Sequence, residues 1–150
     1  MEATDLTLRK TITVARPPEV AFRVFTEGLT SWWPARTHSV GHERVDTIVL
    51  EGHVGGRFYE RLDDGTEHEW GEVTAWEPPH RLGYVWHLRT NRASATDVEI
   101  RFAAVDDGTR VEIEHAGWER LGDAAEAWRD RNHAGWTTLL PHFLAATTAS

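Results

Sequence analysis

Two ionisable side chains, Glu60 and His115, lie in stretches that alternate between apolar and polar residues, so both could point into the protein. A carboxylate and an imidazole that line an apolar cavity could act as an acid–base pair, because burial shifts their pKa values. The two residues are therefore candidates for a general acid–base pair. Two alternatives stay open: they hydrogen-bond each other or water as satisfied core groups, or a one-residue slip in strand parity turns both outward. The sequence alone leaves the catalytic residues unassigned.

Two histidines, His38 and His42, are four residues apart, which is the spacing of metal ligands on one face of a helix. Ser39, Val40 and Gly41 between them do not favour a helix. The chain has no cysteine and no H-E-x-x-H pattern. We therefore interpret both as loop histidines, and we predict no metal site and no cofactor.

The element that must position any such site is the last long stretch of the chain, residues 123–148. Asp123, followed three residues later by Glu126, resembles a capping box at a helix start, and Pro141 is expected to kink the helix or loosen its last turns. At helical spacing one side is mostly apolar and carries Trp128, Asn132, Gly135, Trp136, Leu139, Leu140 and Phe143. The residues expected to face away from that side are Asp130, Arg131, Thr138 and His142.

Most of the chain before this helix shows the alternation that indicates strands with one buried face. Two Asp-Asp-Gly-Thr segments, residues 63–66 and 106–109, are strong hairpin signals, and hairpins imply an antiparallel sheet. We predict an α+β fold in a single domain spanning residues 1–150. Its curved antiparallel sheet of six or seven strands wraps around the long C-terminal helix, and two short helices follow the first strand.

Eleven mostly apolar side chains are expected to line a ligand cavity between the sheet and this helix, since ligand sites are concave, mostly apolar and carry few polar groups. The alternative is a solid core without a hole. The sheet would contribute Phe58, Tyr84, Trp86, Ile100, Phe102, Ile113 and His115. The helix would contribute Trp128, Asn132, Trp136 and Phe143.

The composition excludes several classes of protein. A formal net charge of −8 argues against a nucleic-acid partner, and no stretch is long and apolar enough to span a membrane. The absence of cysteine and of an N-terminal apolar signal core makes the cytoplasm the expected location. Eight tryptophans raise the odds of an aromatic pocket, and an exposed Trp-rich edge could support a homodimer.

Several short motifs, taken in order, resemble a known family. They are P-E-V-A-F at 18–22, G-G-R-F at 55–58, W-G-E-V at 70–73 running into P-P-H-R-L at 78–82, G-T-R-V at 108–111 leading to His115, and Gly135-Trp136 followed by Leu139, Leu140 and Phe143. Over residues 7–146 the chain is similar to the branch of the SRPBCC superfamily named after the activator of Hsp90 ATPase (AHSA1-like), which has the START-like or Bet v 1-like helix-grip fold.

The resemblance implies an apolar cavity between sheet and long helix, because relatives bind lipids, polyketides or plant hormones. Some relatives are aromatases or cyclases, but no invariant catalytic set comes with this branch. Our first hypothesis is therefore a small soluble protein that binds an apolar or aromatic molecule of lipid, polyketide or hormone type, without catalysis. The alternative is an enzyme of cyclase, dehydratase or hydrolase type that uses polar groups in the cavity. A chaperone-interacting module ranks last.

Overall fold

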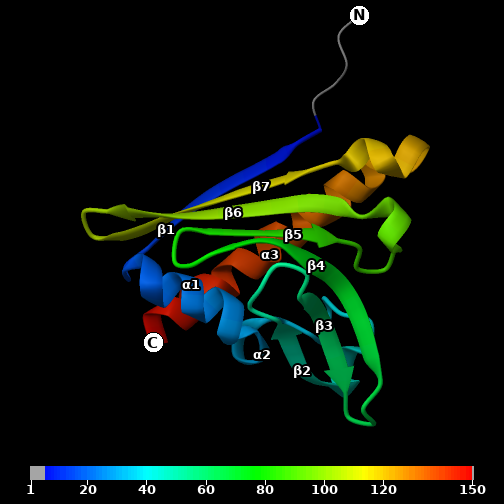
Figure 1. Cartoon of the computed structure of the whole chain (residues 1–150), viewed down its shortest axis with the longest axis horizontal. Helices are drawn as coiled ribbons and strands as arrows, with labels where there is room; N and C mark the ends of the chain where they lie inside the picture. Colours follow the sequence, from blue (N-terminus) through cyan, green and yellow to red (C-terminus); the bar gives the residue numbers. More distant parts are fainter. Residues whose placement is uncertain (1–5, 150) are drawn as a thin grey trace, which may run out of the picture.

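A computed structural model describes residues 6–149 as one curved sheet, one long helix and several short helices (Figure 1). The strands are β1 (Leu8–Val14), β2 (Val45–Leu50), β3 (Arg57–Leu62), β4 (Glu67–Glu77), β5 (Arg81–Trp86), β6 (Thr96–Val105) and β7 (Gly108–Ala116). The α-helices are α1 (Pro18–Glu27), α2 (Leu29–Trp32) and α3 (Ala125–Ala149). Short 3₁₀ helices occupy His42–Arg44, Arg92–Ser94 and Trp118–Ala124.

The seven strands form one antiparallel sheet in the order β1-β7-β6-β5-β4-β3-β2. Each strand from β2 to β7 pairs with its neighbour in sequence, whereas β1 pairs with β7 at the far edge, with Leu8 opposite His115. The sheet curves around α3, and α1 and α2 cover one end of the same face (Figure 1). The predicted α+β helix-grip architecture is confirmed.

Both predicted hairpin turns are present, and local sequence explains the first of them. Residues 63–66 connect β3 to β4, where Gly65 adopts a φ of +88° and the Asp64 carboxylate accepts a hydrogen bond from Thr66 N at 2.9 Å. A left-handed φ favours glycine, and an Asp side chain stabilises a turn by accepting from the backbone two residues later. The second turn, at Asp106 and Asp107, connects β6 to β7.

The long helix begins at Ala125, directly after the 3₁₀ segment, instead of at Asp123. It continues through Pro141 to Ala149, and the Pro141 side chain is exposed. Proline removes one backbone donor but does not end the helix here. The buried face of α3 carries Ala125, Trp136, Leu139, Leu140, Phe143 and Thr147.

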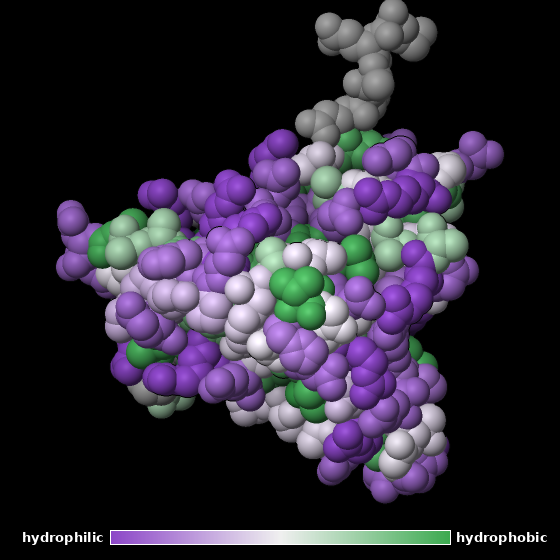
Figure 2. Space-filling model, viewed as in Figure 1, coloured by the Kyte–Doolittle hydropathy of each residue, from purple (hydrophilic) through white to green (hydrophobic). Residues whose placement is uncertain are grey.

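The core lies between α3, the short helices and the concave face of the sheet, and it is dominated by aromatic rings. All eight tryptophans are buried or half-buried, so the described chain has no exposed Trp-rich edge. The expected edge is absent because the indoles pack against one another and against phenylalanines. Figure 2 shows a mostly hydrophilic face with small separate apolar spots; the large hydrophobics exposed within residues 6–149 are Val40, Val54 and Leu144. No helix in this range is long and apolar enough to cross a membrane.

Candidate ligand-binding site

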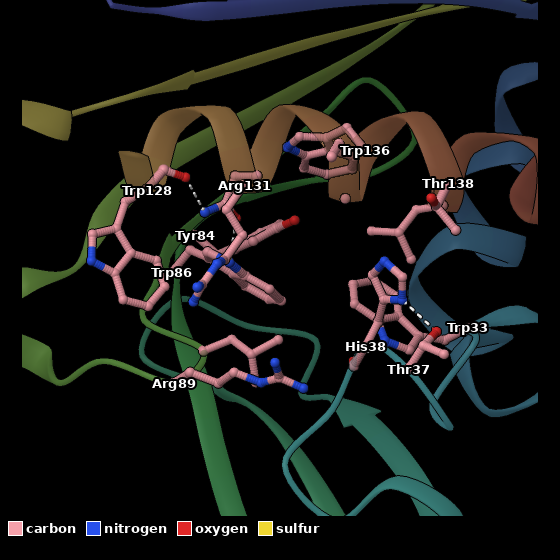
Figure 3. A pocket seen from close by; sticks show the side chains of 15 residues that line it. Trp33, Thr37, His38, Tyr84, Trp86, Arg89, Trp128, Arg131, Trp136 and Thr138 are labelled. Carbon is pink, nitrogen blue, oxygen red and sulfur yellow. Dashed lines mark hydrogen bonds between the residues drawn. The ribbon is translucent and has the colours of Figure 1, made fainter. Parts of the chain in front are cut away.

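A cavity of about 350 Å³ lies between α3, β5 and two loops, residues 33–41 and 87–95 (Figure 3). Five of the fifteen residues that line it are tryptophan or tyrosine: Trp33, Tyr84, Trp86, Trp128 and Trp136. Smaller apolar positions are Leu88, Ala134, Gly135 and Leu139. The polar positions are Thr37, His38, Arg89, Arg131, Asn132 and Thr138.

Hydrogen bonds to protein atoms hold three of the four indoles in place. Trp33 Nε1 donates to the His38 carbonyl at 2.7 Å, and Trp136 Nε1 donates to His115 Nδ1 at 3.1 Å. Trp86 Nε1 donates to Asn132 Oδ1 at 3.2 Å. Because these polar edges are already satisfied, the rings can offer apolar surface to the cavity.

His115 lies behind Trp136 and is only 1 % exposed. Since Nδ1 accepts from Trp136, the proton of the neutral ring sits on Nε2, which lies 2.7 Å from Thr96 Oγ1 and donates to it. Burial lowers the pKa of His115 to about 3. The ring is therefore neutral at physiological pH and links α3 to β6 and β7.

Glu60 is fully buried and accepts three N–H groups, each at 2.7 Å: Val40 N, Gly41 N and Trp70 Nε1. The first two fasten the cavity-lining loop 33–41 to β3. Glu60 and His115 do not hydrogen-bond each other, and neither lies in the cavity wall. The geometry therefore places both as supports of the wall, which differs from the acid–base pair considered on sequence grounds.

The two arginines stand at the mouth of the cavity (Figure 3). Arg89 has a φ of +66°, which is uncommon for a residue with a side chain, and its Nη2 donates to the Ser39 carbonyl at 2.8 Å. This bond joins the two mouth loops. The Arg131 guanidinium lies 4.6 Å from the centre of the Trp128 ring, a cation–π contact.

His38 offers one ring nitrogen to the cavity. The Thr37 hydroxyl lies 3.3 Å from the Pro34 carbonyl and 2.7 Å from His38 Nδ1. When the hydroxyl donates to Pro34, Nδ1–H donates to the hydroxyl, and His38 Nε2 carries no proton in that tautomer. In Figure 3, Nε2 points away from Thr37 toward α3. Desolvation, Arg89 and His142 lower the pKa of His38 below 6.5, so the ring is neutral at pH 7. The Tyr84 side chain opposite stays protonated because burial raises its pKa.

Of the eleven side chains expected at the cavity, five lie in its wall: Tyr84, Trp86, Trp128, Asn132 and Trp136. The other six lie in the packed core or behind the wall: Phe58, Ile100, Phe102, Ile113, His115 and Phe143. Aromatic rings from α1 and α2 fill the end of the sheet at which Phe102 and Phe143 lie. Phe25 lies 5.4 Å from Phe143, and Phe22 lies 5.2 Å from Phe102, measured between ring centres.

Sequence reasoning missed most of the polar wall, including His38, Arg89 and the two helix residues expected to face away, Arg131 and Thr138. These two, with Ala134, form a stripe beside the apolar face of α3. Helical spacing could have revealed that stripe as the border of the face, but nothing in the sequence marked Arg89. His42 Nδ1 bonds the Arg36 carbonyl at 2.9 Å, and no three potential ligands cluster for a metal in residues 6–149.

Comparison with known proteins identifies the family. The family model described as Activator of Hsp90 ATPase homolog 1-like protein matches residues 15–149. A solved anthrahydroquino-Gama-pyrone synthase, Txn09, is 36% identical with a TM-score of 0.59, covering 79% of this chain and 81% of that one. CalC from Micromonospora echinospora, a self-sacrificing resistance protein, is 30% identical with a TM-score of 0.71, covering 95% and 94% of the two chains.

An Aha1 dimer from Colwellia psychrerythraea shares the fold at 19% identity and a TM-score of 0.69, covering 94% of this chain and 95% of that one. No curated protein matched. Family and fold together support a ligand-binding or cyclase-type protein. The chain belongs to the Activator of Hsp90 ATPase homolog 1-like family.

Proposed function

We propose that this protein binds a flat aromatic small molecule in the cavity between α3 and β5. The observation that carries the proposal is the wall itself, where four indoles and a phenol surround about 350 Å³ of space. Aromatic rings gain most from stacked or edge-to-face contacts with other flat rings. A wall built this way fits a fused-ring molecule better than a flexible acyl chain.

The comparisons support the same class of ligand. Txn09 is named as a synthase of an anthrahydroquino-pyrone, and such fused rings are flat and aromatic. Its 36% identity to this chain covers most of both proteins. We propose the cytoplasm as the location, because a chain without cysteine suits a reducing compartment.

A pair of matched variants tests the binding site. Ala134 lies in the cavity wall, whereas Ala127 is exposed on the same helix outside it. Ala134→Phe should abolish binding of the neutral fused-ring probe anthracene-2-carboxamide, because the new ring occupies the cavity. Ala127→Phe should leave binding unchanged in the same calorimetric titration. If the parent binds neither this probe nor its ionised counterpart anthracene-2-carboxylate, or if Ala134→Phe binds the probe as well as the parent, the proposed site is wrong.

His38 favours a second candidate function, a cyclase-type enzyme that moves a proton. In the tautomer with the proton on Nδ1, a neutral His38 has an unprotonated Nε2 beside the aromatic wall and is a suitable general base. A cyclisation that forms a carbon–carbon bond through an enolate requires a base to remove a proton from carbon. His38 would accept that proton, and the protonated Tyr84 hydroxyl would hydrogen-bond the oxygen that gains charge.

The probe 5-nitrobenzisoxazole tests this second function. A base removes its C3 proton, the C–H electron pair forms the nitrile, and the N–O bond breaks to release a coloured cyanophenolate. We expect the parent to catalyse this reaction above buffer at pH 7, with a rate that falls as the pH drops below 6.5 and His38 becomes protonated. His38→Gln should remove the activity and His133→Gln, an exposed control on α3, should keep it. Equal rates for both variants would exclude His38 as the base.

A further inference from the structure

The cavity wall differs in charge from the rest of the molecule. The chain carries a formal net charge of −8, yet the wall contains Arg89, Arg131 and His38 and no Asp or Glu. His38 is neutral at pH 7 because desolvation and the Arg89 charge lower its pKa. The positive charge of the site therefore comes from the two arginines.

These two arginines also differ from most others in the described chain. Most arginines outside the cavity form an ion pair with a carboxylate, as Arg81 does with Glu99 and Arg92 with Glu72. Among the described residues, Arg89 donates a hydrogen bond to the Ser39 carbonyl, and Arg131 makes a cation–π contact with the Trp128 ring. No carboxylate within residues 6–149 neutralises either one.

Both guanidinium groups are held beside the aromatic wall. The bond to Ser39 fixes Arg89 across the two mouth loops, and the ring of Trp128 supports Arg131 from α3. In Figure 3, Arg131 extends down from α3 across the rings of Tyr84 and Trp86, and Arg89 lies below these rings. A guanidinium group has five N–H donors in a plane, so most of these donors remain available for a ligand.

We propose that the cavity selects fused-ring aromatic molecules that carry an ionised acidic group, a carboxylate or a phenolate, which the two arginines hold at the mouth. This inference rests on the proposed binding function and adds the chemical class of the ligand. The ring system lies against the indoles, and the anionic group lies between Arg89 and Arg131.

Two probes of the same size separate charge from shape: anthracene-2-carboxylate and its neutral counterpart anthracene-2-carboxamide. Calorimetric titration at pH 7.5 should give about tenfold tighter binding of the carboxylate, since charge-assisted hydrogen bonds at partly exposed sites are individually modest. Arg131→Gln should bring this ratio close to one, mainly by weakening the carboxylate. Arg131→Lys keeps the charge and should keep most of the preference.

The control is Arg23→Gln, because Arg23 is exposed on α1 and does not line the cavity. It should leave both affinities unchanged. Equal affinity of the parent for both probes would overturn the charge selection while the binding function stands. An unchanged ratio in both Arg131→Gln and Arg89→Gln would overturn it as well. If neither probe binds the parent, the binding function itself fails.

Discussion

His115 shows how a single buried side chain supports the site without touching the cavity. Its two nitrogens join Trp136 of α3 to Thr96 of β6, and the Thr96 hydroxyl in turn bonds the Trp86 carbonyl at 3.3 Å. A ring in this position must be neutral, because a second ring proton would point Nδ1–H at the Trp136 N–H. The protonation state of one residue is thus coupled to the placement of two indoles in the wall.

Replacing His115 by Gln should therefore change how stability depends on pH. The folded pKa of about 3 lies below the ordinary value of 6.5, so the unfolded chain binds the extra proton first as the pH falls. The stability that depends on a neutral His115 is fully present above pH 6.5 and is lost as the pH falls toward 3. Over this range the free energy of unfolding falls by about 1.4 kcal/mol per pH unit. Urea unfolding between pH 7 and pH 4.5 should show a shallower loss of stability for His115→Gln than for the parent. If the free energies of unfolding of His115→Gln and the parent fell in parallel with pH, the coupling of stability to His115 protonation would be contradicted.

Glu60→Gln should loosen the loop that carries Trp33 and His38. One carboxylate oxygen becomes an NH₂ group that faces N–H donors, so we expect a loss of about 2–3 kcal/mol in the free energy of unfolding. Affinity for anthracene-2-carboxamide should fall as well. The control Glu112→Gln removes a half-exposed carboxylate paired with Arg110 and should change stability by less than about 1 kcal/mol. Similar losses in both variants, measured by denaturant unfolding, would refute the anchoring role.

Among the secondary-structure elements, α3 packs one face against the core and lines the cavity with the adjacent face. Trp136, Leu139 and Phe143 pack inward, while Arg131 and Thr138 border the cavity mouth. Gly135 lies between these two faces. An added Cβ there would meet only His38 Cδ2, at 4.0 Å, so no close approach of the sheet requires a glycine.

Gly135→Ala should therefore stabilise the fold and weaken binding at the same time. Alanine is favoured over glycine in a helix by up to about 1 kcal/mol, and the new methyl group enters the cavity opposite His38. Thermal unfolding and a titration with anthracene-2-carboxamide measure the two effects. The reverse control Ala145→Gly, on an exposed part of α3, should lower stability and leave binding unchanged. Unaltered binding in Gly135→Ala would show that the cavity does not extend to this position.

At the scale of the whole molecule, the two ends of the described chain are joined. β1 pairs with β7, and α3 reaches back to the first strand through Arg129 Nε, which donates to the Leu6 carbonyl at 3.1 Å, and Lys10 Nζ, which donates to Thr137 Oγ1 at 3.1 Å. Within residues 6–149, β1 is the strand that covers the β7 edge of the sheet. Removing either end of the chain would therefore expose the core.

This arrangement predicts a single cooperative unfolding transition. Tryptophan fluorescence reports the aromatic wall and core, and far-ultraviolet circular dichroism reports the sheet and α3. The two signals should change at the same urea concentration, because no segment has a core of its own. Two separated transitions would contradict the prediction of one domain.

The helices and strands and most of their order could be predicted from the sequence, because the signals involved are local. Alternating residues, Asp-Asp-Gly-Thr turns and the long apolar face of α3 specify strands, hairpins and a helix through contacts only a few residues apart. The long helix begins at Ala125, two residues after the start predicted at Asp123. Helix termini depend on the preceding segment, which is here a 3₁₀ helix.

Which of the inward side chains face empty space depends on the packing of segments that are distant in sequence. Alternation gives Phe58, Phe102 and Trp86 the same inward direction, but the rings of Phe22, Phe25 and Trp32 fill one end of the sheet and leave the other end open. A cavity is the volume that segments distant in sequence fail to fill, so no local pattern encodes it. The same holds for Arg89, which reaches the cavity mouth because its loop is tied to Ser39, fifty residues earlier in the chain.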